Sequence, residues 1–163
     1  PFSKRFTHLA HEGLGIAFGC GIPMGFSAET GAVPAIAWWL LLINTVWSVI
    51  YDTQYAMVDR ADDLAVGIKS TAILFGRHDV LVIALLMGVM LTLLAAAGWR
   101  LGLAWPWFAA VAVAAVLFAR QLFSIRMREP AACFRAFLEN NWVGCSLFVG
   151  LLLHFVISGA YSG

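Results

Sequence analysis

The sequence has few charged residues: Asp, Glu, Lys and Arg make up 12% of its 163 residues, whereas apolar residues make up 62%. Soluble domains carry about twice that share of charge. The charges are also segregated, so that long stretches contain none. Such stretches cannot remain in water, and the sequence therefore predicts an all-α integral membrane protein, a helical bundle surrounded by lipid.

The sequence also lacks the patterns of several other protein classes. Its three cysteines have no metal-site spacing and indicate packing residues or free thiols. The net charge of +1 carries no information about partners, and no nucleic acid is expected. The first residues have no evident cleavage site for a signal peptide, and the chain starts at Pro1 without a Met. We interpret it as a piece of a longer protein.

About five stretches with at most one charged residue each predict transmembrane helices in a single membrane domain, residues 1–163. The longest, 31–54, can cross the ~30 Å hydrocarbon layer at ~1.5 Å per residue. Residues 55–77 form an aspartate-rich loop between the second and third spans, and residues 120–139 form a basic connection between the fourth and fifth. The predicted spans are residues 12–28, 31–54, 79–99, 103–123 and 141–160.

The basic residues predict how the chain lies in the membrane. With these five spans, Arg100 falls on one side and the other nine Lys and Arg residues fall on the opposite side. Loops rich in Lys and Arg stay in the cytoplasm, so the aspartate-rich loop is expected to face the cytoplasm, with a bacterial inner membrane as the location. The nine are Lys4, Arg5, Arg60, Lys69, Arg77, Arg120, Arg126, Arg128 and Arg135.

Four of the nine acidic residues lie in the segment 51–63, which reads YDTQYAMVDRADD. At helical spacing, Asp52, Tyr55, Asp59 and Asp63 fall on one face. Like charges four residues apart repel, so a cation is expected to offset them. Mg²⁺ suits this arrangement because it takes one or two carboxylates and shares its other positions with phosphate and water. The alternative is a solvated acidic helix end.

This segment resembles the second aspartate-rich motif of the UbiA superfamily of intramembrane prenyltransferases. Asp59-x-x-x-Asp63 is similar to the family's second DxxxD motif, and residues 67–76, GIKSTAILFG, continue the likeness. The likeness is closest to the branch that prenylates 4-hydroxybenzoate on the way to ubiquinone. It implies part of a nine-helix fold around a lipid-tail cavity, in which two aspartate-rich loops hold Mg²⁺ on a prenyl diphosphate.

The resemblance also implies roles for particular residues. Asp59 and Asp63 would bind Mg²⁺, with Asp62 and Asp52 as further ligands or contacts to metal-bound water. Tyr55 could stabilise an allylic cation with its aromatic face. The chain would thus help to transfer a polyprenyl group from polyprenyl diphosphate to 4-hydroxybenzoate.

Three basic residues are also implicated by the resemblance. Lys4 fits the lysine of the family's Tyr-x-x-x-Lys motif, and Lys4 and Lys69 would meet the diphosphate or brace the acidic loop. Arg5 would hold the carboxylate of 4-hydroxybenzoate. The family's first aspartate-rich motif is absent from these residues. We therefore expect further helices, carrying that motif, upstream of Pro1, and a chain that lacks half its metal site on its own.

Two other functions fit parts of the pattern. A non-enzymatic binding or transport subunit could use the acidic loop as a cation vestibule, but only His154 lies deep in a predicted span, which argues against an ion relay. A related prenyltransferase could act on haem, chlorophyllide or homogentisate. Residues 52–59 and the Lys4-Arg5 pair favour 4-hydroxybenzoate over these acceptors.

Overall fold

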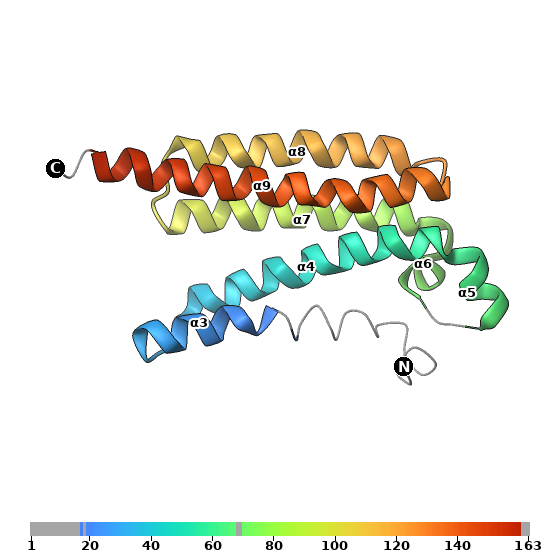
Figure 1. The fold of residues 1–163 in the computed structure, drawn as a ribbon, viewed down its shortest axis with the longest axis horizontal. Coiled ribbons are helices and arrows are strands. Elements are labelled where there is room, and N and C mark those ends of the chain that lie inside the picture. Colours follow the sequence, from blue (N-terminus) through green and yellow to red (C-terminus); the bar gives the residue numbers. More distant parts are fainter. Residues whose placement is uncertain (1–16, 18, 68–69, 161–163) are drawn as a thin grey trace.

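The computed structural model describes residues 17, 19–67 and 70–160. Every regular element in these ranges is a helix, which confirms the all-α prediction. Of the predicted span 12–28, the described part is mainly helix α3, and the rest lies outside the described residues. The elements, labelled in Figure 1, are α3 (Gly21–Thr30), α4 (Ala35–Val58), α5 (Arg60–Val66), α6 (Thr71–Phe75), a 3₁₀ turn (Gly76–His78), α7 (Asp79–Arg100), α8 (Trp105–Ile125) and α9 (Pro130–Ala160).

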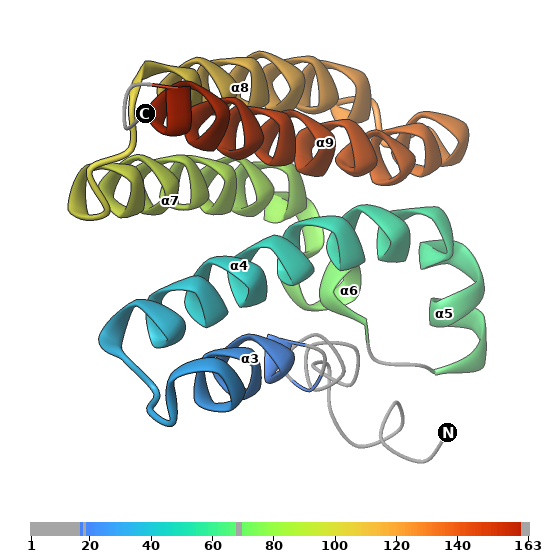
Figure 2. The same ribbon diagram turned by 60° about the vertical axis from the view of Figure 1, so that its left-hand side comes forward.

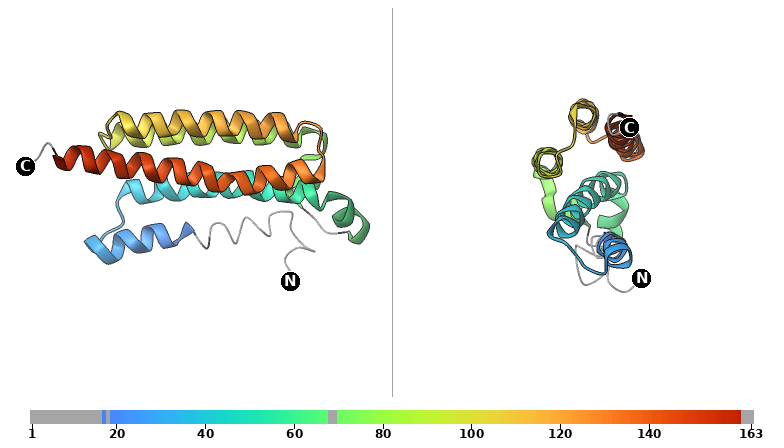
Figure 3. Two further views of the ribbon diagram at one scale, coloured as in Figure 1. Left: turned by 45° about the horizontal axis from the view of Figure 1, so that its top comes forward. Right: turned by 90° about the vertical axis from the view of Figure 1, so that its left-hand side faces the viewer.

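Among the described helices, four are long and apolar enough to cross a membrane: α4, α7 with the short helical turns before it, α8 and α9. Helices α7, α8 and α9 lie side by side, and α4 runs along α7 and α9 (Figures 1 and 3). Helix α3 packs on α4, away from α8 (Figure 2). We call α4, α7, α8 and α9 the bundle. Helices α5 and α6 lie at the end where α8 turns into α9, here called the α5 end.

Prolines mark the starts of three bundle helices. Pro34 precedes α4, Pro106 is the second residue of α8, and Pro130 opens α9. Proline is favoured at these positions because the first turn of a helix has N–H groups without helical acceptors. Helix α9 therefore begins well before residue 141, where the fifth span was predicted. Residues 130–139 form a helix with a buried apolar face rather than an irregular connection.

Small residues allow the bundle helices to approach closely. A Cβ on Gly98 of α7 would collide with the Trp107 ring of α8, and one on Gly150 of α9 would collide with Ala110. Small residues at such contacts are common between helices in lipid. The Trp107 ring fills the space beside Gly98. Its indole N–H donates a 3.1 Å hydrogen bond to the carbonyl of Leu94, which fixes the ring there.

A chain of polar side chains crosses the interior of the bundle, in the half nearer the α5 end. Trp47 Nε1 donates to Asn140 Oδ1 at 3.0 Å, Asn140 Nδ2 donates to Gln54 Oε1 at 2.7 Å, and Gln54 Nε2 donates to Gln121 Oε1 at 3.0 Å. These residues come from α4, α8 and α9. Among the described residues, Gln121 Nε2 has no hydrogen-bond partner. In an apolar surrounding such bonds specify which helix faces meet.

Candidate functional site

The acidic segment is divided between two helices. Helix α4 ends at Val58, Asp59 has φ −90° and ψ 6°, and α5 starts at Arg60. The axis changes direction at this point (Figures 1 and 2). The prediction of one continuous helical face through Asp52, Tyr55, Asp59 and Asp63 is therefore wrong. A straight helix would stack carboxylates three and four residues apart, which is unfavourable.

Asp59 and Asp63 nevertheless remain one helical turn apart. The Asp63 N–H donates a 2.8 Å hydrogen bond to the Asp59 carbonyl, so α5 winds from Asp59 onward. Both side chains are half-buried, whereas Asp62 is exposed. Asp52 is half-buried and lies earlier, on α4. Asp59 and Asp63 are thus one turn apart and both half-buried, whereas Asp62 is exposed.

The four predicted metal ligands do not form a closed cage. Among the described residues, no three Asp, Glu, His or Cys side chains come together in a group that could hold a metal ion. The predicted basic contacts Lys4, Arg5 and Lys69 lie outside the described residues.

Aromatic side chains line the part of α4 that leads to the acidic segment. Tyr55 is 41% exposed and its ring meets Phe137 of α9 edge to face, with 5.3 Å between ring centroids. Tyr51 meets the same Phe137 at 6.2 Å and Trp47 at 6.5 Å. Beside this cluster lies a pocket of about 380 Å³, lined by Trp47, Tyr51, Phe137, Leu138, Asn140, Asn141, Gly144 and Cys145. Aromatic faces near an acidic segment can stabilise a cation.

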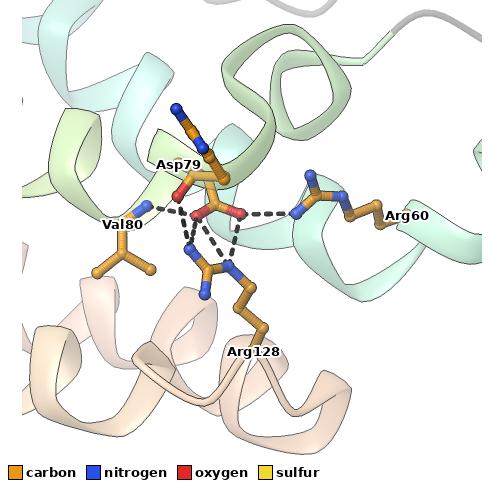
Figure 4. Close-up of polar contacts among 5 residues, drawn as sticks. Arg60, Asp79, Val80 and Arg128 are labelled. Atoms are coloured by element: carbon orange, nitrogen blue, oxygen red, sulfur yellow. Dashed lines mark hydrogen bonds and ion pairs between the residues drawn. The ribbon is translucent and has the colours of Figure 1, made fainter.

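A buried ion cluster lies at the α5 end and was not predicted. Asp79, the first residue of α7, has no exposed surface. Its Oδ2 accepts a 2.8 Å hydrogen bond from Arg60 Nη1, and its Oδ1 accepts one of 2.7 Å from Arg128 Nη2 (Figure 4). Arg128 Nε lies 3.0 and 3.1 Å from the two oxygens. The cluster joins α5, α7 and the α8–α9 turn.

Helix ends and hydrogen bonds stabilise the charges of this cluster. Asp79 lies at the N-terminus of α7 and Arg128 follows the C-terminus of α8, and each position favours the charge found there. The Val80 N–H also donates to Asp79 Oδ1 at 2.7 Å. The hydrogen bond to Asp79 raises the pKa of Arg128 against the opposing effect of burial. A charged residue opening a long apolar run was the available sequence signal for Asp79.

Arginine residues gather at one end of the bundle, as the sequence predicted. The α5 end carries Arg60, Arg77, Arg126 and Arg128, from α5, the 3₁₀ turn and the α8–α9 turn. Arg100 ends α7 at the opposite end, where its guanidinium lies 5.0 Å from the Trp39 ring centroid. At that end, His154 accepts a 3.0 Å hydrogen bond from the Ala104 N–H at the start of α8, a contact that joins α9 to α8.

Comparison with known proteins adds an independent finding. The model of the UbiA prenyltransferase family matches residues 1–154. Proteins described as 4-hydroxybenzoate octaprenyltransferase are similar to 98% of this chain at 55% identity in Alkalilimnicola ehrlichii and to 96% at 54% in Citrobacter koseri. The chain spans about half the length of these curated relatives, 54% in both. No solved structure matches.

Proposed function

Since the chain belongs to the UbiA prenyltransferase family, we propose that the whole protein transfers a polyprenyl group from polyprenyl diphosphate to the aromatic ring of 4-hydroxybenzoate. The supporting observation is identity above one half, over nearly all of this chain, with proteins described as 4-hydroxybenzoate octaprenyltransferase. That likeness includes the acidic segment. This chain would supply one of the two aspartate-rich motifs that the reaction requires.

The donor set at the start of α5 fits Mg²⁺ bound together with a diphosphate. Asp59 and Asp63 come from successive turns and are half-buried, which suits a cation that takes one or two protein carboxylates and keeps positions for phosphate oxygens and water. Asp62 and Asp52 would contact metal-bound water. When bound, Mg²⁺ supplies positive charge that stabilises the departing diphosphate.

The remaining predicted residues would act on the two substrates. Lys4 and Lys69 would bind the diphosphate, and Arg5 would hold the carboxylate of 4-hydroxybenzoate through two parallel hydrogen bonds. Tyr55 is exposed beside the aromatic cluster of α4 and α9, where its ring could face an allylic cation. The roles of Lys4, Lys69 and Arg5 carry over from the family motifs residue by residue, whereas that of Tyr55 rests on the chemistry of its aromatic ring.

The reaction makes one carbon–carbon bond. The allylic carbon–oxygen bond breaks and diphosphate leaves with the electron pair. The ring carbon ortho to the phenol hydroxyl attacks the allylic carbon. The proton on that ring carbon then passes to water, and its bond electrons restore the aromatic ring. Residues at the α5 end bind and orient the diphosphate, while the apolar bundle surface accommodates the prenyl chain.

We further propose that the α5 end faces the cytoplasm of a bacterial cell, with the protein in the inner membrane. The excess of arginine at this end supports that orientation, because cytoplasmic loops carry more Lys and Arg. Polyprenyl diphosphate would reach the site from the lipid, and 4-hydroxybenzoate from the cytoplasm.

The test is a product assay with the full-length protein in membranes. It is incubated with polyprenyl diphosphate and either 4-hydroxybenzoate or homogentisate, with Mg²⁺ or with an excess of chelator. We expect a prenylated product from 4-hydroxybenzoate only, and only with Mg²⁺. Turnover of homogentisate in preference to 4-hydroxybenzoate, or full activity in chelator, would contradict the proposal.

A further inference from the structure

We propose that Asp79 is a positioning residue: by binding Arg60, it fixes the rotation of α5 about its own axis and so sets where Asp59 and Asp63 face. The inference deepens the proposed function and rests on it. It starts from the cluster in Figure 4, in which one buried carboxylate accepts hydrogen bonds from two guanidinium groups on different segments.

Helix α5 makes little buried contact with the rest of the bundle apart from this ion pair. None of its seven residues is buried. A cavity of about 280 Å³ separates it from the start of α9, lined by Met57, Val58, Arg60, Ala61, Leu64, Arg128 and Pro130. Apolar packing therefore contributes little to its orientation. The 2.8 Å contact between Arg60 and Asp79 ties the first turn of α5 directly to α7.

Helix geometry converts that contact into an orientation of the acids. Successive residues are about 100° apart around an α-helix axis. With Arg60 directed at the bundle, Asp63 and Asp59 lie about 60° and about 100° away on the same side, and Asp62 about 160° away. The observed burial agrees, since Asp59 and Asp63 are half-buried and Asp62 is exposed.

The second guanidinium keeps Asp79 in place. Arg128 has φ 56°, a left-handed backbone that side chains other than glycine seldom adopt. From that position it contacts both carboxylate oxygens and also donates to the Arg77 carbonyl at 2.9 Å. The turn between α8 and α9 thus accepts an unfavourable backbone while Arg128 holds the carboxylate. Asp79 is consequently a fixed point to which α5 is attached.

The experiment uses full-length protein in which Cys20, Cys133 and Cys145 are replaced by Ala. Nitroxide labels on Ala65→Cys in α5 and Leu85→Cys in α7, both exposed, report the distance between these helices. Arg60→Met removes the tie but leaves Asp79 paired with Arg128, so the buried charge keeps a partner. Asp79→Asn removes the charge that binds both arginines. Glu139→Gln, which breaks the Arg120–Glu139 pair at 2.6 Å, is the matched control.

We expect Arg60→Met and Asp79→Asn to broaden the label-to-label distance distribution. In the unlabelled protein, both should raise the Mg²⁺ concentration for half-maximal activity by between about ten- and hundredfold, the usual effect of losing a group that orients a metal ligand. The half-saturating 4-hydroxybenzoate concentration should change less than about twofold, since Arg5 is untouched. Glu139→Gln should change none of these quantities.

The outcomes separate this inference from the proposed function. An unchanged distance distribution and an unchanged Mg²⁺ requirement in Arg60→Met would overturn the positioning role. A proportional loss of activity at every Mg²⁺ concentration, with an unchanged distance distribution, would overturn it too and would indicate a purely structural ion pair. If the labels respond but the unmutated protein prenylates no aromatic acid, the attachment of α5 stands and the proposed function fails.

Discussion

Asn140 of α9 donates a 2.7 Å hydrogen bond from its Nδ2 to Oε1 of Gln54 in α4, and both side chains are buried. Asn140 Oδ1 in turn accepts the Trp47 indole N–H at 3.0 Å. The Asn140 amide therefore binds two α4 residues, one through its oxygen and the other through its nitrogen. A side chain of similar volume without the amide would leave Trp47 and Gln54 each short of a partner.

Asn140→Leu should therefore destabilise the bundle by about 1–3 kcal/mol, because the half-buried Trp47 donor and the buried Gln54 acceptor lose their hydrogen bonds. The midpoint of thermal unfolding in detergent measures this. Asn141→Leu is the control, since Asn141 is exposed and the same exchange there should leave the midpoint nearly unchanged. Equal effects at the two positions would show that the hydrogen bonds of Asn140 contribute nothing specific.

Alanine at Gly98 and at Gly88 of α7 should have opposite effects. A Cβ on Gly98 meets the Trp107 ring, and overpacking of this kind costs about 1–3 kcal/mol. Nothing lies within 4 Å of a Cβ on Gly88, where alanine should stabilise the helix by up to about 1 kcal/mol. Thermal unfolding of the two variants compares them directly, and a stabilised Gly98→Ala protein would contradict the packing described.

Asp59→Ala and Asp63→Ala should each abolish Mg²⁺-dependent turnover in the full-length protein, and Asp62→Ala should be milder. Asp59 and Asp63 are one turn apart and half-buried, whereas Asp62 is exposed on another side of α5. The measurement is the rate of prenylation at several Mg²⁺ concentrations. Equal losses at all three positions would mean that the pair was chosen wrongly.

Arg5→Lys should raise the half-saturating concentration of 4-hydroxybenzoate nearly as much as Arg5→Ala does, because lysine cannot form two parallel hydrogen bonds with a carboxylate. Losing such a contact costs ~1.5–3 kcal/mol, or about ten- to hundredfold in affinity. Prenyl diphosphate and a phenol without the carboxylate should be much less affected. Wild-type kinetics in Arg5→Lys, or equal effects on both acceptors, would exclude this role.

Much of the fold followed from hydropathy, because helices that cross lipid must be long and apolar along their whole length. The helix ends were less predictable. Residues 130–139 contain Arg135 and Glu139, which indicated a connection, but the helix places Arg135 on an exposed face and lets Glu139 bind Arg120. Polar residues at helical spacing beyond an apolar run are compatible with a loop or with a continued helix. Packing against α8 favours the helix here.

The acidic segment illustrates a different limit. The spacing of Asp59 and Asp63 predicted that they lie one helical turn apart, since that depends on local helix geometry alone. The change of direction at Asp59 and the ion pair between Asp79 and Arg128 did not follow from spacing. Residues 79 and 128 are 49 positions apart, and the pair exists only because α7, α8 and α9 pack together. Contacts of this kind depend on the completed fold.

Two indole groups give α7 a further property. The Trp39 N–H of α4 donates to the carbonyl of Leu93 at 3.1 Å, and the Trp107 N–H of α8 donates to the neighbouring carbonyl of Leu94 at 3.1 Å. Hydrogen bonds from α4 and α8 therefore fix α7 near its C-terminal end, remote from Asp79. They oppose sliding of α7 along its axis. This helix can serve as an internal frame of reference: a displacement measured from α7 during turnover can be assigned to the segment that carries the other probe.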